Sequence, residues 1–206
     1  MPAPVEAPTA KEVTPTGERA AVLGSPPGPA EREWARLIAR TADPAGLDLR
    51  DGFAAFESAL ERGDLAAARA VASETLNIAR LRRTGAGGTP RALRDLSIAL
   101  DNVGQVEREL GNLEAARSAY RESLELFRRL REAVGDTPQA LRDLSISLDN
   151  VSRVERDLGN LEGARSAFRE SLEIARRLRR SFPDQPQFQQ DLARLGARSK
   201  GLIDQS

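Results

Sequence analysis

The sequence contains no cysteine and no histidine in 206 residues, and only 4% of the residues are aromatic. Without thiols the chain has no disulfide framework and no redox-active pair, as in proteins of a reducing cytoplasm. The usual ligands of zinc and copper are missing, and so is the side chain best suited to proton transfer near neutral pH. Only carboxylates remain for such chemistry, and they form no catalytic pattern. We therefore expect no enzyme activity, no metal and no cofactor.

The chain also lacks an excess of charge of one sign and a long hydrophobic run. Its 31 basic and 31 acidic residues balance, so no overall field attracts nucleic acid or an anionic membrane. No apolar run approaches the roughly 20 residues that cross a bilayer. Residues 1–13 lack the basic-then-apolar layout of a signal peptide. These absences predict a cytoplasmic protein without a membrane partner.

What the sequence does contain is a repeat. Residues 89–136 and 137–184 are two copies of one 48-residue segment, and 35 of the 48 aligned positions are identical without a gap. A shift of another 48 residues relates the segment that starts at Gly63 to those that start at Gly111 and Gly159. A period between about 20 and 50 residues is typical of solenoids, in which each unit buries its apolar face on its neighbours.

Each unit carries the signals of two helices. Thr89 suits an N-cap, and Pro90 suits the first helical position, where a missing N–H costs nothing. Gly111 is suited to end this helix and Asn112 to cap the next. Apolar residues recur at steps of three and four, which predicts two antiparallel helices of about 20 residues. These residues are Leu93, Leu96, Leu100, Val103 and Leu110 on the first helix, and Leu113, Ala116, Tyr120, Leu124, Phe127 and Leu130 on the second.

The remaining segments flank this array. Residues 1–29 hold seven of the 12 prolines and cannot bury enough apolar surface to offset the entropy of ordering them. Trp34 lies on a short helical stripe that is expected to pack on the first repeat, with stacking on a ligand as the alternative. The predicted division is a disordered Pro-rich tail at 1–29, an N-terminal capping helix at 30–45, a degenerate repeat at 46–88, full repeats at 89–136 and 137–184, and a C-terminal capping helix at 185–206.

The residues of one unit resemble a tetratricopeptide repeat. That family places a small residue after an apolar one on the first helix, and Ala followed four positions later by an aromatic residue on the second. The matching residues are Leu100, Val103, Gly104, Ala116 and Tyr120, and in the next copy Leu148, Val151, Ser152, Ala164 and Phe168. The resemblance covers about residues 49–204. It implies an all-α fold, a right-handed α-solenoid of antiparallel helix hairpins.

The period of 48 residues exceeds the usual period of that family, which is about 34. In this respect the chain is similar to the long repeat arrays of bacterial multidomain proteins, where such repeats accompany signalling or effector domains.

The resemblance also implies a binding site. Members of the family bind extended peptides or partner helices in a concave groove lined by the first helices, where an Asn amide holds the ligand backbone. By this resemblance the central residues are Asn102 and Asn150. The alternative is that this face is only a solvated polar surface. The other groove residues implied are Asp101, Gln105 and Arg108, then Asp149, Arg153 and Arg156, with Ile98, Glu109, Ile146 and Asp157 beside them.

Two further features allow a structural or a functional interpretation. Glu107 and Glu155 interrupt the apolar stripe of the first helix, so each should either tilt to the rim or meet an Arg, unless it acts as a functional acid. Arginines at the ends of the second helices should stack into a basic ridge. They can complement the helix dipole or face a phosphate or an acidic partner. They are Arg80, Arg82 and Arg83, then Arg128, Arg129 and Arg131, then Arg176, Arg177, Arg179 and Arg180.

From these features we expect a non-catalytic scaffold or adaptor that binds a protein or peptide ligand. A self-associating structural module is the first alternative, because two nearly identical repeats can stack or swap between chains. Binding of nucleic acid through the Arg ridge is the second and weaker alternative, because no aromatic residues interleave with the arginines.

Overall fold

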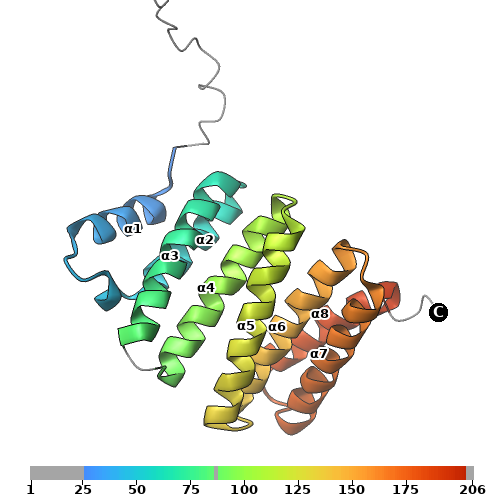
Figure 1. The fold of residues 1–206 in the computed structure, drawn as a ribbon. Coiled ribbons are helices and arrows are strands. Elements are labelled where there is room, and N and C mark those ends of the chain that lie inside the picture. The colour runs from blue at the N-terminus through green and yellow to red at the C-terminus, as the bar shows by residue number, and fades with distance from the viewer. Residues whose placement is uncertain (1–25, 86–87, 203–206) are drawn as a thin grey trace, which may run out of the picture.

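The computed structural model describes residues 26–85 and 88–202, with side chains up to Ser199. All regular structure in these residues is helical, and consecutive helices pack side by side along the chain (Figure 1). The fold is therefore all-α, as predicted. The elements are α1 (Pro29–Arg40), the short 3₁₀ helix η2 (Pro44–Gly46), α2 (Leu49–Glu61), α3 (Leu65–Gly85), α4 (Pro90–Glu109), α5 (Leu113–Val134), α6 (Pro138–Asp157), α7 (Leu161–Ser181) and α8 (Pro186–Leu202).

Local capping sets where the repeat helices begin. The Thr89 hydroxyl accepts a hydrogen bond from the backbone N–H of Ala92 at 3.3 Å, and Pro90 is the first residue of α4. One repeat later, the Thr137 hydroxyl accepts from the N–H of Ala140 at 3.2 Å. These bonds satisfy N–H groups that have no partner within the helix.

Three glycines make the turns inside the hairpins. Gly63, Gly111 and Gly159 have φ values of +69°, +81° and +80°. Side chains with a Cβ disfavour this left-handed region, so glycine is the residue that ends α2, α4 and α6 with the least strain. The tight turns bring the two helices of each hairpin together in antiparallel fashion.

Buried serines join the two helices of a hairpin at their middle. The Ser123 hydroxyl of α5 donates to the backbone carbonyl of Ser97 in α4 at 3.0 Å. The same bond recurs one repeat later, where Ser171 donates to the carbonyl of Ser145 at 2.8 Å. All four serines are buried, so these bonds replace hydration that the hydroxyls lose on folding.

The first helices of successive hairpins touch each other directly. Besides the contacts between neighbours in the chain, α2 contacts α4, and α4 contacts α6. We call the surface formed by α2, α4, α6 and α8 the first-helix face. It carries most of the residues that the sequence singled out.

Helices α1 and α8 lie at the two ends of the array (Figure 1). Trp34 of α1 is 2% exposed and belongs to the core formed with α2, α3 and α4. At the other end, Phe188 and Leu195 of α8 are buried against α6 and α7. Such ends shield the apolar interior of a repeat array from water.

The predicted Pro-rich tail lies outside the described residues up to position 25. Pro29, which the sequence placed in that tail, begins α1 instead. Proline is favoured at the first helical position because its missing N–H would have no partner there. None of the described helices is long and apolar enough to span a bilayer.

Candidate functional site

The first-helix face is hollowed by a groove of about 680 Å³ near the beginnings of α2, α4 and α6. We call this the first-helix groove. The last turn of α5, which leads into α6, forms part of its wall. The groove therefore crosses two repeat boundaries.

Apolar side chains from three helices contribute to the groove. Phe53 of α2 and Ile98 of α4 are half-buried, and Val134 at the end of α5 is 37% exposed. Partly exposed apolar groups within one concave site are a common feature of binding surfaces, because a ligand that covers them removes them from water.

Charged residues line the same groove in balanced numbers. Three arginines and three aspartates take part, and they pair with one another. The side chain of Arg50 donates to Asp48 at 2.6 Å and lowers the pKa of this carboxyl to about 2. The other two pairs are Arg94 with Asp143 at 2.8 Å and Arg91 with Asp95 at 3.9 Å.

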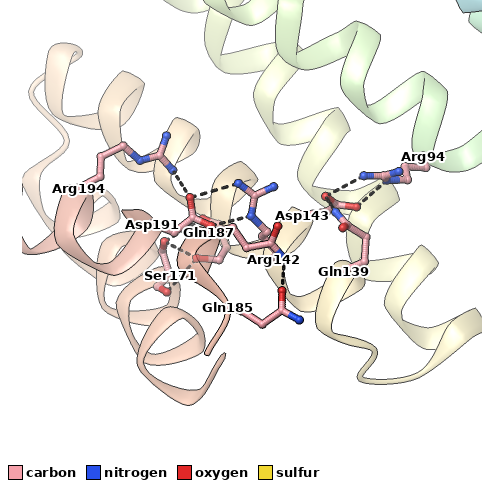
Figure 2. Close-up of polar contacts among 10 residues, drawn as sticks. Arg94, Gln139, Arg142, Asp143, Ser171, Gln185, Gln187, Asp191 and Arg194 are labelled. Atoms are coloured by element: carbon pink, nitrogen blue, oxygen red, sulfur yellow. Dashed lines mark hydrogen bonds and ion pairs between the residues drawn. The ribbon is translucent and has the colours of Figure 1, made fainter. Parts of the chain in front are cut away.

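One of these pairs repeats along the first-helix face (Figure 2). Arg94 of α4 reaches Asp143 of α6 at 2.8 Å, and Arg142 of α6 reaches Asp191 of α8 at 2.6 Å. Gln139 also donates to Asp143, at 2.7 Å. The pairs join one repeat to the next and are partly buried, so solvent screens them less than it would screen exposed pairs.

The groove residues implied by the family resemblance lie mostly farther along the first helices. Of these residues, only Ile98 lines the first-helix groove. Asn102 is 8% exposed, so little of its amide is accessible, and the half-buried Asn150 interacts with Asp101. Binding of a peptide by Asn102 and Asn150 stays a prediction.

The predicted charged residues further along are held by other protein groups. Arg108 of α4 donates to Asp157 of α6 at 2.6 Å, and Arg156 approaches the same carboxylate at 3.2 Å. Gln105 donates to Glu109 within α4 at 3.4 Å. Asp149 pairs with Arg198 of α8. The pairs Arg108–Asp157 and Asp149–Arg198 connect repeats. All of these side chains become available to a ligand only if such bonds exchange.

Glu107 and Glu155 are buried and paired. Arg69 donates to Glu107 at 2.7 Å, and Arg121 donates to Glu155 at 2.6 Å. The amides of Asn112 and Asn160 donate to the same two carboxylates at 2.7 and 2.8 Å. Of the two structural arrangements expected for each Glu, a tilt to the rim or a meeting with an Arg, the structure shows the second. Both are anchors between the repeats.

The arginines at the ends of the second helices are largely paired with acids. Arg80 lies 3.4 Å from Glu122, and Arg128 lies 3.2 Å from Glu170, so the same pair recurs one repeat later. Asp136 accepts from both Arg131 and Arg177. The predicted ridge is therefore a surface of mixed charge over much of its length.

Sequence reasoning missed several residues that the structure brings to this face. Phe53, Val134 and Arg94 line the groove, and Arg198 pairs with Asp149. The repeat period could have revealed Arg198, because it stands 48 residues after Asn150. Phe53 lies in the degenerate first repeat, where the pattern is too weak to place a single side chain.

Comparison with known proteins matches part of the helical array to one family. Residues 95–177 match the family model described as tetratricopeptide repeat, a span that runs from α4 to α7. Over this span the chain is similar to tetratricopeptide repeats. Repeats of this kind fit a protein-interaction scaffold in general.

Similar solved structures have low sequence identity to the chain. The de novo designed helical repeat protein DHR64 is 17% identical, with 84% of this chain and 88% of that chain covered and a TM-score of 0.35. The DHF119 filament is 16% identical, with coverage of 85% and 89% and a TM-score of 0.34. The DHF58 filament is 19% identical, with coverage of 85% and 91% and a TM-score of 0.33. No curated protein matches the sequence.

Proposed function

We propose that this protein is a non-catalytic scaffold that docks a segment of a partner protein in the first-helix groove. The observation that carries the proposal is the groove itself, because it joins apolar side chains of three helices across two repeat boundaries. The tetratricopeptide repeats support a role in protein interaction, and an extended peptide or a partner helix suits a groove of this shape.

The pairing of charges in the groove bears on the chemistry of the partner. Arg50, Arg91 and Arg94 each have an aspartate nearby, so the groove presents no excess of either sign. A strongly acidic or basic tail would gain little net attraction here. We infer that apolar side chains of the partner provide most of the affinity by covering Phe53, Ile98 and Val134.

The test places a charge in the groove. Ile98→Asp should weaken binding of a partner captured from lysate at least tenfold, because it puts an unpaired carboxylate against the apolar contact. Leu81→Asp is the matched control, since Leu81 is 53% exposed on α3 and does not line the groove. Affinity would be measured by calorimetry and folding by circular dichroism. Equal affinities of wild type and Ile98→Asp, with the fold intact, would contradict the groove as the docking site.

The prediction for the asparagines is tested with the same partner. Asn102→Ala and Asn150→Ala should each weaken binding if their amides hold the backbone of the ligand. Unchanged affinity would remove these two residues from the site and leave the groove proposal intact.

A second candidate function is head-to-tail self-association, and one observation favours it. The pairs Arg80–Glu122 and Arg128–Glu170 follow the 48-residue period. The period also relates Glu74 to Glu122, and Arg176 to Arg128. Within the described residues, neither Glu74 nor Arg176 has an ion pair, and both are exposed.

Opposite ends of the array thus carry opposite charges that could pair between copies. Sedimentation velocity over a hundredfold range of concentration tests this candidate. Self-association predicts that the sedimentation coefficient of the wild type increases with concentration and that Arg176→Glu abolishes this increase. A monomer at all concentrations would exclude self-association.

A further inference from the structure

An ion pair is buried between α6 and α8. The Arg198 guanidinium donates to both carboxylate oxygens of Asp149, which is 3% exposed. The Cζ atom of Arg198 also lies 5.9 Å from the centroid of the Phe168 ring. The guanidinium therefore has a carboxylate as acceptor and an aromatic ring as neighbour, two contacts that suit arginine well.

The preceding joint, between α4 and α6, has a carboxylate and an aromatic ring at the same positions but no cation. The repeat period leads from Asp149 back to Asp101, from Phe168 back to Tyr120 and from Arg198 back to Asn150. A short amide thus stands where the next joint has a guanidinium.

Asp101 lacks the donor that Asp149 has. Its Oδ1 atom is buried and has no hydrogen-bond partner among the described residues, although the residue as a whole is only half-buried. Burial raises the pKa of Asp101 to about 7, and the neighbouring side chains of Ser123 and Asn150 offset part of this rise. A buried acceptor without a donor is costly, so a donor from another molecule would be stabilised there.

The charged groups around Asp101 include a second carboxylate. Asp143 of α6 is close enough to raise the pKa of Asp101 further. Arg94 and Gln139 already donate to Asp143. Because Asp143 also lines the first-helix groove, Asp101 adjoins the site of the proposed function.

We infer that Asp101 and Asn150 form a subsite for one arginine side chain of the partner protein. The guanidinium would occupy the place that Arg198 occupies beside Asp149, with the Asp101 carboxylate as its acceptor. Arginine is preferred over lysine because its planar group can donate twice to a carboxylate. The inference rests on the proposed function and names one side chain of its partner.

Two cations of the chain itself lie near Tyr120. They are Arg108, which pairs with Asp157, and Arg153. Arg153 follows Asn150 by three residues on α6 and affects the pKa of Tyr120, but it is not among the groups that shift the pKa of Asp101. If Arg153 swung onto Asp101 in solution, Arg153→Ala would strengthen binding of an external guanidinium. The binding site would still be Asp101, and the variant would lack the Arg153 guanidinium that competes for it.

The test uses L-argininamide as the probe and L-lysinamide as its comparison. Binding is followed by NMR shifts of the Ser123 and Asn150 amides in the whole chain. We expect millimolar affinity, on the order of that of a single partly buried ion pair. Affinity should rise about tenfold between pH 6 and pH 8, because Asp101 ionises with a pKa of about 7.

Three variants make the result specific. Asp101→Asn removes the charge with little change of shape, and Asn150→Arg supplies the guanidinium from the chain, so each should weaken probe binding at least tenfold. Arg198→Asn copies the open joint into the last repeat and should add a second site, seen as shifts around Ser171. Each variant that folds tests the subsite by its change in probe binding, even if another variant fails to fold.

The inference is overturned if argininamide leaves the Ser123 and Asn150 signals unshifted, or if Asp101→Asn binds it as well as wild type does. Its failure is distinguishable from failure of the groove. Loss of partner binding in Ile98→Asp, together with unchanged partner binding in Asp101→Asn and Asn150→Arg, would support the groove and reject the arginine subsite.

Discussion

The Tyr120 ring of α5 lies directly over Gly104 of α4, so closely that a Cβ added at Gly104 would be 2.6 Å from two ring carbons. Tyr120 is 2% exposed, and burial raises its pKa above the usual range. The missing side chain of Gly104 therefore lets the two helices of this hairpin approach around the ring.

Gly104→Ala should destabilise the protein by about 1–3 kcal/mol, because the added methyl group forces the ring or the helix to move. The measurement is the urea midpoint at constant m-value. Gly196→Ala in α8 is the control, since a Cβ there meets nothing within 4 Å. Alanine at that helical position should stabilise by about 0.5–1 kcal/mol. Similar midpoints for the two variants would contradict the packing described for Tyr120.

Arg121→Ala should cost about 1–3 kcal/mol of unfolding free energy. It leaves the carboxylate of Glu155, which is 1% exposed, with Asn160 as its remaining side-chain donor. Arg129→Ala is the control, because Arg129 and Glu125 are both exposed and their pair should contribute at most about 0.5 kcal/mol. Equal losses in urea denaturation would show that Glu155 does not depend on Arg121.

The stability of the wild type relative to Asp101→Asn should depend on pH. The folded-state pKa of Asp101 is about 7, above its ordinary value of 3.8. The folded state thus favours the protonated carboxyl, and this contribution is fully present below about pH 4 and is lost as pH rises through 7. Urea unfolding at several pH values between 4 and 8 measures the difference.

The free energy of unfolding of Asp101→Asn should therefore increase relative to that of the wild type as pH rises. Near pH 8 the variant should be the more stable of the two. Taking the difference cancels the effect of other carboxyls, such as Asp48 and Asp136, whose pKa values are lowered. A difference that does not change between pH 4 and pH 8 would contradict the buried, cation-free environment of Asp101.

Nucleic-acid binding through the Arg ridge should be weak. The pairs Arg80–Glu122 and Arg128–Glu170 cancel much of its charge. Fluorescence anisotropy with a single-stranded oligonucleotide should show little binding at about 0.1 M salt. Glu122→Gln with Glu170→Gln should increase binding and its salt dependence, because it frees two cations to contact phosphates. Tight, steeply salt-dependent binding by the wild type would instead favour the nucleic-acid alternative.

The helices of the repeats could be predicted from the sequence because their signals are local. Thr89 and Pro90 start a helix, and Gly111 ends it, through bonds and backbone angles that involve only a few neighbouring residues. The aromatic partner of Gly104 was implied by the resemblance to the tetratricopeptide repeat, which combines a small residue on the first helix with an aromatic residue on the second. The pairing of Glu107 with an arginine was one of two expected arrangements, the other being a tilt to the rim, because a buried carboxylate requires a donor.

The polar residues of the first helices could not be assigned in the same way. Arg108 and Asp149 looked like groove residues, yet each pairs with a residue of the adjoining repeat. A polar side chain of a first helix can contact either a residue of the adjoining repeat or a ligand. The outcome depends on the rotation and spacing of the hairpins. A shift of a few ångströms between helices changes the partner without changing the pattern.

An array of helical hairpins is encoded locally, because capping residues, glycine turns and the apolar period act over short distances and recur every 48 residues. Which surfaces remain open depends instead on how the hairpins pack together. The first-helix groove and the cation-free joint at Asp101 arise where separate repeats meet, and their geometry follows from packing between helices that are far apart in the chain.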